Sequence, residues 1–290
     1  MEKTSNVNKT ALSKLLVAIF AVAILCPLAK AQTIGGDDLK IFEFNSDVQV
    51  RNKTIVADNG RNYPIVHSGH DTEESKQASG APCRVYYPFR KGAQLEYTIY
   101  DHKDKVSGYL SQQITEVKNT AKGLKITAQS QHLNKKRKLN YSGKVHMRCE
   151  GNVFYADVRN LLDPKSLQAF QNDSQVEISG IDAAIPGNIQ VGKTLPDAKI
   201  TLKIKTKDIP LPPTVISVKQ RKVLAREKIS TPAGSFDCYK ISSEFQIESI
   251  INIHMKTIEW IAPNVGTVQS ETYNDKDKCI AKMQLSSFEE

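Results

Sequence analysis

Several signatures of enzymes and metalloproteins are missing from this chain. It has no Gly-x-Ser-x-Gly turn of the kind that presents a serine nucleophile, and no Cys-x-x-Cys pair that would suggest a zinc site. The single tryptophan, Trp260, alternates with apolar neighbours, which is typical of a core position. We therefore predict no enzyme activity, no cofactor and no metal.

The chain also lacks an apolar run long enough to cross a membrane, since a spanning helix needs ~20 apolar residues. Its N-terminal region instead has the zones of a secretory signal peptide: lysines, the apolar run Leu15 to Leu25, and the small-residue site Ala29-Lys30-Ala31. We predict cleavage after Ala31, a periplasmic or secreted protein, and no transmembrane segment after cleavage. A retained anchor and lipidation of Cys26 are the alternatives.

Positive charge is present but not concentrated. The net charge is +9, and the predicted signal peptide removes four of the 40 basic residues and one of the 31 acidic ones, leaving a mild surplus. The one dense run, Lys135-Lys136-Arg137-Lys138, lies between two strand patterns and is predicted to cap a hairpin. Solvated strand faces explain this distribution better than nucleic-acid binding, so we predict no nucleic-acid partner.

Four of the five cysteines remain after cleavage, at positions 83, 149, 238 and 279. An even number in an exported chain suggests disulfides, with three possible pairings. We predict a bond between Cys149 and Cys238, because each lies on a strong strand pattern. Cys83 and Cys279 would then pair with each other or remain free.

Hydrophobicity alternates with a period of two over most of the chain after Cys83, and polar turn sequences separate the runs. The turns are expected at 101–104, 186–188, 232–234, 263–266 and 274–277. We predict an all-β fold, an antiparallel curved sheet or half-barrel of about ten strands. One short helix is expected at Pro164–Gln171, and Ile209–Pro213 is a candidate boundary or crossover. The predicted organisation is a signal peptide (1–31), a polar, partly ordered extension (32–82) and a β-rich domain (83–290).

Side chains with catalytic potential are scattered. His67, His70 and Asp71 could bind a metal, but they lie in the polar extension, where short His and Asp groupings usually arise by chance. The glutamates Glu244, Glu248, Glu259 and Glu271 fall on different strands, and their spacing does not place them in one groove.

A large amphipathic sheet without a catalytic constellation is typical of a binding protein, because a strongly curved sheet can enclose an apolar pocket. We therefore predict non-catalytic binding of a lipid, acyl chain or lipoprotein on the concave face of the sheet. A structural or protein–protein interaction module of the cell envelope is the alternative, and an enzyme comes third. The predicted ligand-binding residues are Leu95, Tyr97, Ile99, Leu124, Ile126 and Ile204.

Five stretches together form a recognisable signature: Tyr86–Gly92, Cys149–Tyr155, Val191–Pro196, Thr231–Ile241 and Glu259–Gly266. They resemble the TapB-like family of exported bacterial proteins, over about residues 83 to 287. The resemblance implies a domain of unknown function with a curved sheet similar to that of the lipoprotein carriers LolA and LolB, and it brings no catalytic residues. The longer polar lead at 32–82 and Cys279 depart from the family pattern.

Overall fold

The computed structural model describes residues 86–161, 174–206, 212–249 and 252–290. Within these ranges the chain forms one antiparallel sheet of thirteen strands and a single short 3₁₀ helix, η1, at Val158–Leu161. The prediction of an all-β antiparallel fold is therefore confirmed. The expected signal peptide, the extension at 32–82 and the helix at Pro164–Gln171 lie outside the described residues.

The sheet follows the order β6-β8-β9-β10-β11-β12-β13-β1-β2-β3-β4-β5-β7, so the first and last strands of the domain, β1 and β13, are neighbours at its centre. One half contains β1 (Gln94–Asp101), β2 (Val106–Thr120), β3 (Gly123–Asn134), β4 (Leu139–Glu150), β5 (Val153–Ala156) and β7 (Ala183–Pro186). The other half contains β6 (Ser174–Ile181), β8 (Ala198–Thr206), β9 (Thr214–Thr231), β10 (Gly234–Glu248), β11 (Ile253–Ala262), β12 (Gly266–Tyr273) and β13 (Cys279–Glu289).

Turn chemistry was a reliable guide to where strands end. All five predicted turns separate consecutive strands, and the basic run 135–138 closes the hairpin between β3 and β4. Gly234 has a φ of +133°, which a residue with a side chain rarely adopts, and it starts β10 directly after the Pro232-Ala233 turn. Local sequence therefore determines about half of the connections between consecutive strands.

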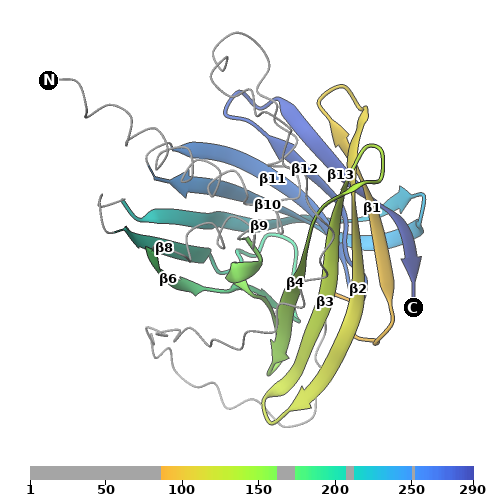
Figure 1. The fold of residues 1–290 in the computed structure, drawn as a ribbon. Helices are drawn as coiled ribbons and strands as arrows, with labels where there is room; N and C mark the ends of the chain where they lie inside the picture. The colour runs from red at the N-terminus through yellow and green to blue at the C-terminus, as the bar shows by residue number, and fades with distance from the viewer. Residues whose placement is uncertain (1–85, 162–173, 207–211, 250–251) are drawn as a thin grey trace, which may run out of the picture.

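The sheet is so strongly curved that its two ends meet around η1 (Figure 1), which contacts both β4 and β8. Asp182, between β6 and β7, accepts a hydrogen bond from the Val158 backbone N–H (3.0 Å) and pairs with Arg148 of β4. Gly180 of β6 allows this approach, because a Cβ there would lie 2.3 Å from the Lys199 carbonyl oxygen and 3.0 Å from Val158 Cγ2. The concave face is thus nearly enclosed.

Inward-facing side chains of both halves form one continuous hydrophobic core, to which Leu95, Ile126, Ile200 and Ile241 belong. A second, smaller cluster lies on the opposite face of β10, β11 and β12 and consists of Cys238, Trp260, Ala262 and Val268. The indole N–H of Trp260 donates to Glu227, and Lys240 Nζ lies 4.9 Å from the Trp260 ring centroid. The core role predicted for Trp260 is confirmed.

Candidate binding cavity

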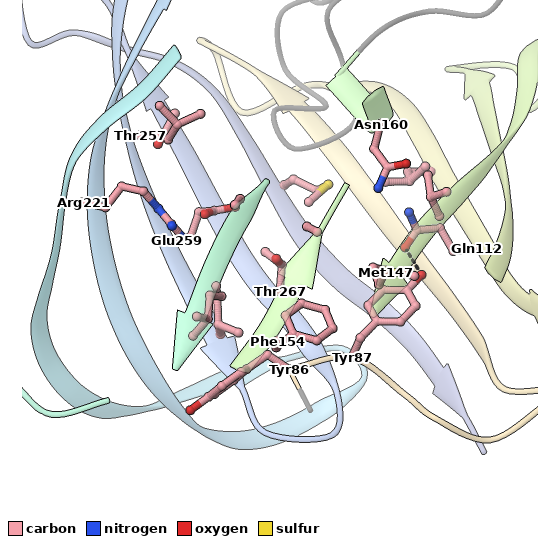
Figure 2. A pocket seen from close by; sticks show the side chains of 18 of the residues that line it. Tyr86, Tyr87, Gln112, Met147, Phe154, Asn160, Arg221, Thr257, Glu259 and Thr267 are labelled. Atoms are coloured by element: carbon pink, nitrogen blue, oxygen red, sulfur yellow. Dashed lines mark hydrogen bonds between the residues drawn. The ribbon is translucent and has the colours of Figure 1, made fainter. Parts of the chain in front are cut away.

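A cavity of about 120 Å³ lies inside the curved sheet, where the two halves face each other. Figure 2 shows its side chains converging from strands of both halves. Its apolar lining comprises Leu110, Val145, Met147, Phe154, Ala156, Ala183, Ile185, Val218, Phe245, Ile261 and Met283. Its polar lining comprises Tyr86, Tyr87, Tyr97, Gln112, Asn160, Arg221, Thr257, Glu259 and Thr267.

A β-bulge points Arg221 into this cavity. Ile216 and Val218 face inward on β9, so regular alternation would place Gln220 inward and Arg221 outward. Lys219 pairs with Glu244 and Lys222 with Ser242, so two residues of β9 lie opposite one residue of β10. Gln220 adopts a φ of +51°, and the chain resumes with Arg221 facing inward. Bulges that redirect a side chain are common beside functional sites.

Arg221 connects three parts of the fold. Its Nη1 donates to the Ala184 carbonyl of β7 (2.8 Å) and to the Pro196 carbonyl that precedes β8 (2.7 Å). Its exposed fraction is only 5%. Burial lowers the pKa of the guanidinium, while the charges of Glu259 and Asp197 raise it, and an arginine with two such bonds remains charged at neutral pH.

Glu259 is the second charged group of the cavity and lies on the inward face of β11 between Thr257 and Ile261. Figure 2 shows the guanidinium end of Arg221 beside it. Burial raises the pKa of the Glu259 carboxyl to about 7, although the positive charge of Arg221 acts in the opposite direction. At neutral pH the cavity therefore contains a permanent cation and a carboxyl group that is about half protonated.

Hydroxyl and amide groups line the part of the cavity bounded by β1 and β2. Tyr87 donates a hydrogen bond of 2.7 Å to Gln112 Oε1, and Tyr86 packs edge-on against Phe154 with 6.3 Å between ring centroids. Burial raises the pKa of both Tyr87 and Tyr97, and the charge of Glu259 raises that of Tyr97 further. The two phenols are therefore neutral hydrogen-bonding groups.

The six residues predicted to bind ligand are not gathered around this cavity. Tyr97 lines it. Leu95, Ile99, Ile126 and Ile204 are buried in the packed core, and Leu124 is partly buried against that core. Their inward orientation was anticipated, but the cavity is formed mainly by other side chains.

Arg221 was not identified from the sequence, and Glu259 was noted only as one of four scattered glutamates. A signal for the bulge does exist, because the inward apolar positions of β9 change from even numbers, Ile216 and Val218, to the odd-numbered Val223. The pairing of β11 with β12 also shifts between Trp260 and Ile261, but there the extra residue is Val268 of β12, and β11 alternates regularly through Glu259. Interrupted alternation therefore marks Arg221 but not Glu259.

The predicted Cys149–Cys238 disulfide is wrong, because Cys238 is a free, buried thiol in the second core cluster. The prediction failed because both residues lie on strands but face different cores, Cys149 the main one and Cys238 the smaller one. Cys279 is also free. Cys149 is disulfide-bonded, so its partner lies outside the described residues.

Other candidate sites are either not described or not formed. His67, His70 and Asp71 lie outside the described residues, and the described part of the chain contains no group of three or more His, Cys, Asp or Glu positioned to hold a metal. No helix within the described ranges is long and apolar enough to span a bilayer.

The stretch Gly187–Thr194 matches the spacing Gly-x₄-Gly-Lys-Thr of a phosphate-binding loop. That motif binds phosphate only when it connects a strand to the N-terminus of a helix. Here it connects β7 to the strand β8, and Thr194 forms an isolated bridge with Lys222 of β9. The stretch is therefore a structural connection and not a phosphate site.

Two solved structures share this architecture. One is a candidate exported protein with a YmcC-like fold from Bacteroides fragilis, with a TM-score of 0.57 and 25% identity over 72% of this chain and 100% of that protein. The other is a candidate lipoprotein from Parabacteroides distasonis, with a TM-score of 0.59 and 22% identity over 72% of this chain and all (100%) of that protein.

Curated proteins offer no match to this chain. The TapB-like and LolA/LolB-like names are not confirmed by the comparisons, which support a YmcC-like fold and a different family model. That model covers residues 90–285, which include every strand from β1 to β12 and most of β13. The chain therefore belongs to the DUF3108-like family, a family defined by a domain of unknown function.

Proposed function

We propose that this protein is a non-catalytic binding protein of the cell envelope that holds the apolar part of a small amphiphile, such as the end of an acyl chain, in the cavity between the two halves of the sheet. The observation that carries the proposal is the lining itself, which is mostly apolar and contains one buried cation beside one partly buried carboxyl. Binding sites characteristically combine apolar walls with a few convergent polar groups.

The size of the cavity defines how much of a ligand it can hold. An apolar cavity of about 150 Å³ can bind benzene. The 120 Å³ available here therefore suits a group of roughly six heavy atoms. A longer acyl chain would have only its end enclosed, with the remainder outside the cavity. This proposal narrows the predicted lipid site from the whole concave face to one enclosed region.

The proposed location in the envelope rests on the predicted signal peptide. The structural neighbour from Bacteroides fragilis is a candidate exported protein, which supports this location. The other neighbour, a candidate lipoprotein, shares the fold.

An envelope interaction module is the second candidate function. All six predicted ligand positions, including the cavity-lining Tyr97, are packed into or against the core, as expected for a sheet whose interior serves stability alone. In that case the outer face or an edge of the sheet would contact a partner protein, and the cavity would contain only water.

Methyl NMR on the mature protein separates the two functions. Met147 and Met283 line the cavity, whereas Met255 is buried in the same core but does not line it. With ¹³C-methyl methionine labelling, added hexanoate or decanoate should shift the Met147 and Met283 signals and leave the Met255 signal in place. Equal shifts at all three, or none, would contradict binding in the cavity.

A cavity-filling variant provides a second test. Ala183 lines the cavity, so Ala183→Leu should occupy it and weaken uptake of the probe. Ala225→Leu adds the same volume at a half-buried position of β9 outside the lining and should bind normally. Native mass spectrometry of protein purified from the envelope, followed by lipid extraction, would identify a natural occupant. A clean apo mass together with no probe uptake would favour the interaction module.

A further inference from the structure

We propose that the cavity selects a ligand that carries a carboxylate, with the carboxylate bound between the guanidinium of Arg221 and the carboxyl of Glu259. This inference rests on the proposed function and names the chemical class of its ligand. The shared chemistry could come from a free fatty acid or from another short apolar acid.

Arg221 has hydrogen-bonding capacity left for such a ligand. A guanidinium has five N–H donors, and both hydrogen bonds found for Arg221 among the described residues use Nη1. Those two bonds anchor the group to the carbonyls of Ala184 and Pro196, so its orientation is fixed before a ligand arrives. A pre-oriented arginine binds carboxylates through paired, charge-assisted hydrogen bonds.

Glu259 would complete the site in its protonated form. A protonated carboxyl donates one hydrogen bond, so it can bind an anionic oxygen that an ionised carboxylate would repel. Ser270 lies opposite Glu259 on β12, and cross-strand partners share a face of the sheet. The Ser270 side chain is 97% buried, with 3% exposed, and its hydroxyl has no hydrogen-bond partner among the described residues. Ser270 does not line the cavity itself, so its buried hydroxyl is a hydrogen-bonding group beside Glu259 and not a direct ligand contact.

Few charged groups surround Glu259, so a bound anion would change its protonation state. Arg221 of β9 and Tyr97 of β1 are the titratable or charged groups that interact with it, and Asp197 acts on Arg221. The neighbouring positions on β10 and β12, Ile241 and Ser270, carry no charge. A bound carboxylate adds a negative charge and favours protonated Glu259. The affinity for a carboxylate should therefore fall as the pH rises past about 7, which is the pKa of Glu259 in the protein without a ligand.

The wild-type mature protein tests this inference with three probes: hexanoate, 1-hexanol and acetate. Titrations followed by the Met147 and Met283 methyl signals should show hexanoate binding at least about tenfold more tightly than 1-hexanol at pH 6, since a hydrogen bond to a charged group is the difference. Acetate has the carboxylate without the chain and should bind weakly. Between pH 6 and pH 8 the affinity for hexanoate should fall about tenfold while that for 1-hexanol stays constant.

Two variants assign these effects to residues. Glu259→Gln keeps a donor but cannot titrate, so it should abolish the pH dependence of hexanoate binding. Arg221→Gln should remove the preference, so that hexanoate and 1-hexanol bind with about equal affinity. Thermal unfolding checks that each variant is folded, and the wild-type comparison of probes remains decisive if Arg221→Gln is not.

The outcomes separate the two proposals. Equal affinities for hexanoate and 1-hexanol in the wild type would overturn the carboxylate site and leave cavity binding intact. A preference for hexanoate with no pH dependence would overturn the role of Glu259. Failure of every probe to shift Met147 or Met283 would overturn the proposed function itself.

Discussion

Replacing Glu259 by glutamine should change how the stability of the protein depends on pH. The folded protein holds the pKa of Glu259 at about 7, against an ordinary value of 4.5. Between these values the unfolded chain has lost the proton and the folded protein retains it, so unfolding becomes easier as the pH rises. The loss of stability reaches its full size once the pH exceeds the pKa of Glu259 in the folded protein.

The size of the effect follows from the shift. One pKa unit corresponds to 1.36 kcal/mol, so the rise from 4.5 to about 7 makes wild-type folding roughly 3 kcal/mol less favourable at pH 8 than at pH 4.5, from this residue alone. Glu259→Gln removes that contribution. The variant should therefore gain stability relative to the wild type as the pH rises, by up to about 3 kcal/mol at pH 8.

Urea unfolding at pH 5, 6, 7 and 8 measures the difference, provided that the dependence on denaturant is the same for both proteins. Glu248→Gln is the matched control. Glu248 is exposed on β10, so this replacement removes one negative charge from the surface and leaves the cavity unchanged. If Glu259→Gln and the wild type lose stability in parallel between pH 5 and pH 8, the carboxyl is not held in a buried environment and the reasoning about the cavity fails.

Three further predictions concern the closure of the sheet, the bulge and the disulfide. Gly180→Ala should destabilise the fold by roughly 1–3 kcal/mol, because its Cβ would lie 2.3 Å from the Lys199 carbonyl oxygen, and a normal melting temperature would contradict the close approach of β6 to its neighbours. Gln220→Gly should stabilise the protein by up to about 1 kcal/mol in urea unfolding, since glycine adopts a φ of +51° without strain; a loss of stability would argue against the left-handed bulge. Non-reducing peptide mapping should find Cys149 bonded to Cys83. Tyr86 follows Cys83 by three residues and packs on Phe154, which is the cross-strand neighbour of Cys149. A peptide containing free Cys149 would refute this prediction.

The class of fold was predictable because it depends on local pattern. Strict alternation in segments such as Leu95-Glu96-Tyr97-Thr98-Ile99 determines which side chains face the core, and the polar turns determine where each strand ends. The short β5 shows the limit of this signal. Val153 and Tyr155 have the expected spacing, but Phe154 and Ala156 are the buried pair. In a four-residue strand both phases look alike, and the neighbouring strands decide between them.

The sequence by itself determined an antiparallel, amphipathic sheet and the position of about half of its turns, because alternation and turn residues act over a few neighbours. Only the tertiary structure decided that β9 contains a bulge, that Arg221 therefore points inward, and that Glu259 lies beside it across the sheet. Those features depend on strand order, curvature and contacts between residues far apart in the chain. Burying a charged group in an apolar interior is costly, so local sequence patterns, which place apolar residues inward, do not predict where Arg221 and Glu259 lie.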